Sequence, residues 1–460
     1  MTIPVSRLHE MPPGLEESAQ LIADLDDCFF CGFSRLGEQN LDALRSLSAT
    51  FSGTPLEERL SEAVDQFSRA QFSREAFQTM AAARAAIQGA RHDAITDQLS
   101  TLFGWENAPA LEHQPVEAPP EIANWLESTG QWLMEIALTG FASLDEDTVV
   151  PFDSTLRELH ERPQALRIAS LLTGFREELL ANAPTASMEK VPSTRWADLW
   201  SRAMLHTLTL PPSYTAEPVS GVLRIIGVDL RHHSNMASFV AYGLLDDGDK
   251  TRFVRTTFSS YKVDIIIGEE IWGVFSESAS PLLKAIGSEK ELAVTDMPLL
   301  PTGDLLWNGQ AKVGKKFNML KESEKFFGPD ADESATMPAL DPLDRHPVQL
   351  AVPIYLDDYE IEFGAEADTG AAPQISLGDG SQIELDVQRI SPHSELELDH
   401  IMGSKKMFGL LRMDAGTWRL QPLVETKRSK LAFTGSSANS SKSNATVSTL
   451  RERAGKLLRK

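Results

Sequence analysis

Carboxylate side chains recur near the ends of expected elements in the second half of the chain. Asp229 lies within an expected strand, Glu270 near the start of an expected helix, and Asp296 at the end of a later strand. Two divalent cations such as Mg²⁺, held about 4 Å apart, need clustered carboxylate oxygens of this kind. These three residues, with Asp357 as a further acid, form the candidate catalytic set. Acids at such positions also suit the helix dipole and solvent, so a surface role stays open.

The order of elements around these acids is similar to that of ribonuclease H-like nucleases. An expected strand at 222–230 is followed by strands at 237–245 and 251–258, then by an apolar run at 263–267 that predicts another strand. An expected helix at 269–286 and a strand at 291–295 complete the pattern, which covers about 70 residues. The resemblance implies a metal-dependent nuclease that uses Asp229, Glu270 and Asp296 with a divalent metal such as Mg²⁺.

The two cysteines form the motif Cys28-Phe29-Phe30-Cys31. A structural zinc ion needs four ligands, and this motif supplies two, with no histidine at ligand spacing. A redox-active pair would follow a strand, whereas these residues lie in an apolar helical pattern. Cys28 and Cys31 are therefore weak metal candidates, and buried structural thiols are the favoured interpretation.

Histidines and lysines give further candidates of lower specificity. His232-His233 comes at an expected strand end, where metal binding or proton relay competes with an ordinary loop. His393 and His400 flank alternating acids that are typical of a solvated strand face. The basic cluster at 312–316 (KVGKK) could contact phosphate or an acidic partner, or simply be a solvated loop. Glycine-rich phosphate loops, GxSxG and HExxH are absent from the sequence.

Trp196 and Trp200 are four residues apart in an expected helix at 194–208, so they share one helical face. Arg195 and Arg202 lie beside them, and tryptophan with arginine is typical of interaction hot spots. This face is therefore a candidate partner-binding surface, and packing against neighbouring helices is the favoured interpretation.

The last residues, 447–460 (VSTLRERAGKLLRK), follow a Ser/Asn-rich linker and predict a short basic amphipathic helix. Its predicted partner-binding residues are Leu450, Arg451, Arg453, Leu457, Leu458 and Arg459. Such a helix could dock on a partner protein, lie on an anionic membrane, or fold back on the acidic body. A disordered tail without a role is the remaining alternative.

Charge limits the partners of the body. The chain carries a net charge of −23; residues 426–460 hold nine Lys or Arg and one Glu, which leaves −31 for the rest. A body that acidic repels phosphate backbones, so nucleic-acid binding is disfavoured. The same charge keeps a protein soluble and attracts its own basic tail.

The composition predicts an ordinary multidomain globular protein. The 460 residues are 42% hydrophobic, and at about 100–200 residues per domain they make two to four domains. Two cysteines exclude a secreted disulfide framework, and the N-terminus shows no signal peptide. With no apolar run of about 18 residues, no membrane span is expected, and the cytoplasm is the expected location.

The layout predicts an α+β fold with an α-helical N-terminal half and a mixed, strand-rich C-terminal half that contains antiparallel hairpins. The predicted segments are an irregular N-terminus (1–14), a helical domain (15–107), a Pro-rich linker (108–120), a helical region (121–210), an α+β domain (219–327), an acidic Pro-rich loop (328–347), a β-rich region (348–425), a flexible linker (426–446) and the basic helix (447–460).

Two stretches resemble segments of uncharacterised bacterial proteins. RWADLWSRAM (195–204) and FGLLRMDAGTWRLQPL (408–423) are similar to parts of proteins encoded beside a MoxR-type AAA ATPase, a von Willebrand A protein and a SWIM zinc-finger protein. The resemblance covers about 26 residues and implies an accessory subunit of an ATPase-driven assembly, without cofactors or catalytic residues. The leading functional hypothesis is thus a non-catalytic bacterial adaptor that binds other proteins, and the nuclease is the alternative.

Overall fold

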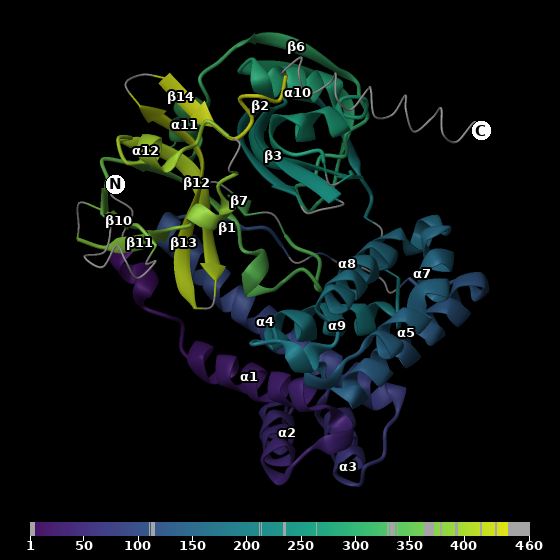
Figure 1. Ribbon diagram of the computed structural model, residues 1–460. Helices are drawn as coiled ribbons and strands as arrows, with labels where there is room; N and C mark the ends of the chain where they lie inside the picture. Colours follow the sequence, from purple (N-terminus) through teal and green to yellow (C-terminus); the bar gives the residue numbers. More distant parts are fainter. Residues whose placement is uncertain are drawn as a thin grey trace, which may run out of the picture.

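Helices fill the N-terminal half of the chain and strands the C-terminal half, as Figure 1 shows. This arrangement confirms the predicted α+β class. The computed structural model describes residues 5–109, 111, 116–210, 212, 214–232, 236–263, 265–328, 331, 336–337, 339–362, 372–377, 380–391, 394–414, 416–427 and 430–439. No helix in this part of the chain combines the length and the apolar character that a membrane span requires.

The α-helices are α1 (Leu15–Cys31), α2 (Glu38–Thr50), α3 (Glu57–Ser68), α4 (Arg74–Phe103), α5 (Pro120–Thr139), α6 (Glu146–Val149), α7 (Asp153–His160), α8 (Leu166–Asn182), α9 (Ser193–His206), α10 (Ser280–Gly287), α11 (Met319–Phe327) and α12 (Leu398–Ile401). The 3-10 helices used below are η7 (Gly268–Phe275) and η8 (Pro347–Gln349). The strands are β1 (Glu106–Asn107), β2 (Glu217–His232), β3 (Met236–Asp246), β4 (Thr251–Tyr261), β5 (Lys290–Leu299), β6 (Ala311–Lys316), β7 (Thr336–Met337), β8 (Val352–Asp357), β9 (Glu360–Glu362), β10 (Gln374–Ser376), β11 (Gln382–Leu385), β12 (Lys406–Asp414), β13 (Thr417–Lys427) and β14 (Lys430–Phe433).

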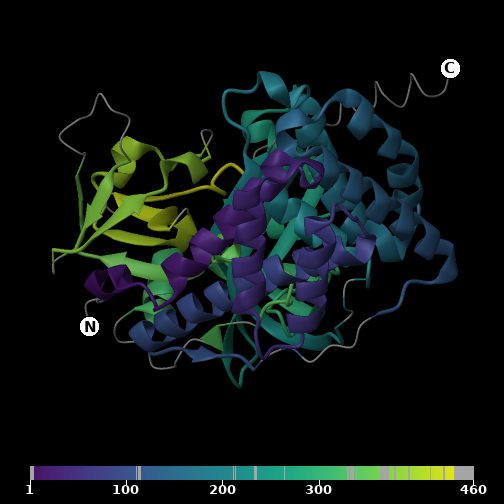
Figure 2. The same cartoon turned by 90° about the horizontal axis from the view of Figure 1, so that it is seen from below.

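The 30-residue helix α4 connects the two halves. It starts at an N-cap, where the Ser73 hydroxyl accepts a hydrogen bond from the Ala76 amide, and ends at Gly104 with φ of 68°. Its first half packs in the core of the helices, whereas Ile95 and Leu99 pack under the second sheet together with Leu8. Figure 2 shows α4 and the N-terminal segment running together towards that sheet.

Two sheets form the C-terminal half. The first has the order β4-β3-β2-β5-β6, with antiparallel neighbours throughout. The second has the order β8-β12-β13-β11-β10-β9, and β14 also pairs with β13. The sheets pack against each other at Gly227 of β2, where a Cβ atom would lie 2.8 Å from Leu423 Cδ1 of β13. The short strands β1 and β7 form a separate parallel pair.

Several expected elements differ in the structure. The described residues of the run at 263–267 form no strand, and the single helix expected at 269–286 is divided into η7 and α10. Residues 430–433, expected in a flexible linker, form β14 because their backbone completes a ladder with β13. The hairpin between β3 and β4 is confirmed, with Gly248 at φ of 95° in its turn.

Candidate functional site

The candidate acids do not converge. Because β5 runs antiparallel to β2, Asp296 lies beside Ser220, whose hydroxyl accepts a hydrogen bond from its amide at 2.9 Å. Asp229 is nine residues further along β2, which is roughly 30 Å at about 3.3 Å per residue. Glu270 lies in η7, outside this sheet. Within the described residues, no group of three or more His, Cys, Asp or Glu could hold a metal ion.

Asp229 instead joins the two sheets. Its Oδ1 accepts a hydrogen bond from Gln421 Nε2 at 2.8 Å, and Gln421 Oε1 in turn accepts one from Arg412 Nε at 2.7 Å. Its Oδ2 lies 2.8 Å from Arg231 Nη2 and 3.4 Å from Arg412 Nη2. Both carboxylate oxygens are therefore committed to protein partners in a buried contact between β2 and β13.

The CxxC motif lies at the end of α1. Cys28 is fully buried, and its Sγ donates to the Asp24 carbonyl at 3.5 Å. Burial raises the pKa of the Cys28 thiol to about 12, so the thiolate that binds metals is disfavoured. Cys31 is half-buried, and neither thiol forms a disulfide.

The tryptophans predicted to bind a partner belong to the helical core. Trp196 and Trp200 are fully buried, and their Nε1 atoms donate to Glu178 Oε2 at 3.1 Å and to the Leu133 carbonyl at 2.7 Å. Trp200 also packs against Phe29, with ring centroids 4.5 Å apart. Neither side chain is available to a partner, and the core-packing alternative holds.

The remaining candidates are dispersed. The basic cluster is the edge strand β6, whose Lys312, Lys315 and Lys316 are exposed. His400 is half-buried, and its Nδ1 lies 3.0 Å from the Glu395 carbonyl oxygen, while His232 ends β2. Outside the described residues lie His233, Ser234, Asn235, His393 and the C-terminal positions Leu450, Arg451, Arg453, Leu457, Leu458 and Arg459.

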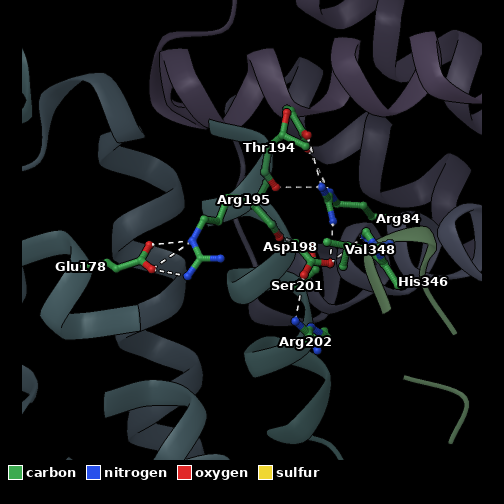
Figure 3. Close-up of polar contacts among 11 residues, drawn as sticks. Arg84, Glu178, Thr194, Arg195, Asp198, Ser201, Arg202, His346 and Val348 are labelled. Carbon is green, nitrogen blue, oxygen red and sulfur yellow. Dashed lines mark hydrogen bonds and ion pairs between the residues drawn. The ribbon is translucent and has the colours of Figure 1, made fainter. Parts of the chain in front are cut away.

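Sequence reasoning missed a network of charged side chains between α4, α9 and η8, shown in Figure 3. Asp198 on α9 lies 3.4 Å from Arg84 Nη1, 2.9 Å from Arg202 Nη2, and 3.1 Å from His346 Nε2. Burial acts to raise the pKa of Asp198, but these three basic partners outweigh it and hold the pKa well below its usual range. The Val348 amide donates to His346 Nδ1 at 3.0 Å, which orients the ring towards Asp198.

Ion pairs connect the segment around η8 to helices of the N-terminal half. Arg345 Nη1 lies 2.8 Å from Asp93 Oδ2 of α4, and Asp344 Oδ2 lies 2.9 Å from Arg167 Nη2 of α8. Part of the expected acidic loop at 328–347 is thus a polar junction between the two halves. The alternation of acids with Arg345 and His346 was the available signal, although their partners lie far away in sequence.

A cavity of about 60 Å³ lies at the same junction, between α4, the first sheet and the segment before β8. His92 lines it, and burial lowers the pKa of its imidazole. Arg255, on another wall, binds Asp304 through Nε and Nη2 at 2.6 and 3.0 Å. One water needs about 10–15 Å³, so the cavity has room for a few waters or a small uncharged molecule.

The stability of the fold is expected to depend on pH through His206, the last residue of α9. Burial first, and then Arg167, lower its pKa to about 4, against about 6.5 for an unfolded chain. Between these values the unfolded state binds more protons, so stability falls as pH drops from about 6.5 to about 4, by up to about 3 kcal/mol. Urea unfolding of the wild type and His206→Gln at both pH values checks this. We expect the variant to lose less stability on acidification; an equal loss in both proteins would contradict the assignment.

Among the described residues, a dense group of exposed apolar side chains lies at the end of β4 and directly after it. Tyr261, Val263, Ile265 and Ile267, here called the apolar strip, are 62%, 53%, 66% and 56% exposed. Ile266 between them is buried and anchors the segment to the sheet core. The β-branched run was visible in the sequence, but it was interpreted as another strand.

Comparisons with known proteins identify no relative: no family model, no curated protein and no solved structure matches this chain.

Proposed function

We propose that this chain is a non-catalytic accessory subunit that captures another protein through the apolar strip. The observation that carries the proposal is the exposure of four large apolar side chains within seven residues. Closely spaced, exposed large apolar side chains of this kind typically mark a site of protein association. Burying an exposed isoleucine contributes about 1.5–3 kcal/mol, so even part of the strip can support specific binding.

The sheet edge beside the strip supports the same function. The amide and carbonyl of Arg255 point away from β3, to Gly303 and Leu305, and strand alternation directs those of Ser259 the same way. From Thr256 to Tyr261 this edge carries no charged residue, whereas the opposite edge, β6, carries three lysines. Lysines protect sheet edges against pairing, so β4 is the edge suited to an added strand.

Charge indicates the kind of partner. The chain carries −23, and residues 440–460, with six Lys or Arg and one Glu, contribute +5, which leaves −28 for the rest. Such a body favours a partner segment with basic residues flanking its apolar ones, because opposite charges speed association. The resemblance of 195–204 and 408–423 to bacterial proteins encoded beside AAA ATPases would place this partner in an ATPase-driven assembly.

The test is site-specific photo-crosslinking in the native host. A photoreactive residue at position 263 is expected to trap a discrete partner, and one at Leu208, an isolated exposed residue after α9, is not. With purified partner, Ile265→Ser/Ile267→Ser is expected to raise the dissociation constant at least about tenfold, equivalent to about 1.4 kcal/mol.

Leu208→Ser is the control, because it replaces an exposed apolar side chain outside the strip. It should leave both the partner affinity and the melting temperature unchanged. Equal trapping at positions 263 and 208, or unchanged affinity of the double variant, would refute the proposal.

A further inference from the structure

The described chain ends beside the first sheet, at Asn439, which packs against Gly287 at the end of α10. Four residues earlier, Gly435 packs against Val228 of β2. Val228 pairs with Ala241 of β3, which in turn pairs with Thr256 of β4. Tyr261 is five residues further along β4. With strands about 4.8 Å apart and about 3.3 Å per residue, Gly435 and Tyr261 are roughly 20 Å apart.

The remaining chain is long enough to cross this distance. Leu450 is eleven residues beyond Asn439, and an extended chain spans up to about 3.3–3.6 Å per residue, or about 36–40 Å here. Asn439 is four residues from Gly435 and so at most about 14 Å from it, which makes the chain long enough to bring Leu450 to Tyr261 at the start of the strip.

The chemistry of this segment matches the strip and its surroundings. Its apolar residues are Leu450, Ala454, Leu457 and Leu458, spaced i, i+4, i+7 and i+8, with basic residues between them. The +5 charge of residues 440–460 opposes −28 on the rest, and Glu269 is exposed two residues beyond Ile267. A tethered segment also acts at a high effective concentration, which compensates for a weak contact.

We infer that residues 447–460 cover the apolar strip of their own chain and compete there with the partner. The inference rests on the proposed function for the partner's part, but coverage of the strip is independent of it. While the segment covers the strip, the strip cannot associate unspecifically with other molecules. A partner that binds the strip must first displace the C-terminal segment. The segment is thus a regulator of the docking surface, weakened by salt because charge steers it.

Full-length variants test coverage without any partner. Leu457→Ser/Leu458→Ser is expected to raise the fluorescence of anilinonaphthalene sulfonate, a dye that binds exposed apolar surface, at least about twofold. Adding Ile265→Ser/Ile267→Ser should return the signal to the wild-type level, because the strip is then polar. Adding Leu208→Ser instead should not. Unchanged dye binding in the first variant would overturn the inference.

Carbodiimide crosslinking identifies the occupant. Links between Lys456 or Lys460 and Glu269 that do not depend on protein concentration support coverage within one chain; links that grow with concentration assign it to a second copy and overturn it. Against purified partner, Leu457→Ser/Leu458→Ser should tighten binding severalfold. If Leu457→Ser/Leu458→Ser increases dye binding but no partner binds the strip, the proposed function alone is contradicted. If a partner binds the wild type and this variant with the same affinity, only this inference is contradicted.

Discussion

Replacing Arg84 with methionine is expected to lower the free energy of unfolding by about 3–5 kcal/mol. The Arg84 side chain is fully buried, and its Nε and Nη2 lie 2.9 and 3.2 Å from the two oxygens of Asp26, which is buried as well. Nη2 also donates to the Thr194 carbonyl at 3.1 Å. Methionine preserves much of the volume but leaves the Asp26 carboxylate without a counter-ion, and the cost of that buried charge dominates.

Urea unfolding followed by helical circular dichroism measures this effect. Arg45→Met is the matched control, because Arg45 pairs with Glu38 and Asp42 on an exposed helix face, where solvent screens the ion pair and its loss should cost far less than the loss of Arg84. Arg84→Met/Asp26→Asn should recover part of the loss, since no charge is then buried alone. A cost for Arg84→Met as small as that for Arg45→Met would show that the network does not stabilise the fold.

Trp200→Ala is expected to destabilise the helical half by a similar amount, about 3–5 kcal/mol, because it opens a cavity in a fully buried site. The ring packs between Phe29 and Phe77, with centroids 4.5 and 6.1 Å away, and its Nε1 donates to the Leu133 carbonyl. Differential scanning calorimetry at neutral pH, with Leu208→Ala as the exposed control, measures the difference. The control should stay within about 0.5 kcal/mol of wild type; a Trp200→Ala variant that does the same would contradict the assignment of this ring to the core.

Local pattern was sufficient to predict the elements that depend on local chemistry. Helical spacing in the first half and the hairpin turn around Gly248 both reappear in the structure, because helices and tight turns are specified by neighbouring residues. Residues 430–433 (KLAF) were missed for the opposite reason: so short a run carries no strand signal of its own, and it becomes β14 only because its backbone pairs with β13.

The candidate sites depended on long-range pairing, which the sequence does not specify. The order of strands around Asp229 is similar to that of ribonuclease H-like nucleases. However, β5 runs antiparallel to β2, which places Asp296 at the end of β2 that is far from Asp229. Arg84 was overlooked within an alanine-rich helix, although it follows the buried Met80 by one turn and so belongs to the buried face. Its partners, Asp26 and Asp198, are 58 and 114 residues away.

Helix α4 has a mechanical consequence. At about 1.5 Å per residue its 30 residues form a rod about 45 Å long, with one end fixed among the other helices and the other beneath the second sheet. Because this one continuous helix belongs to the cores of both halves, a rotation of one half against the other requires α4 to bend or to break its contacts at one end.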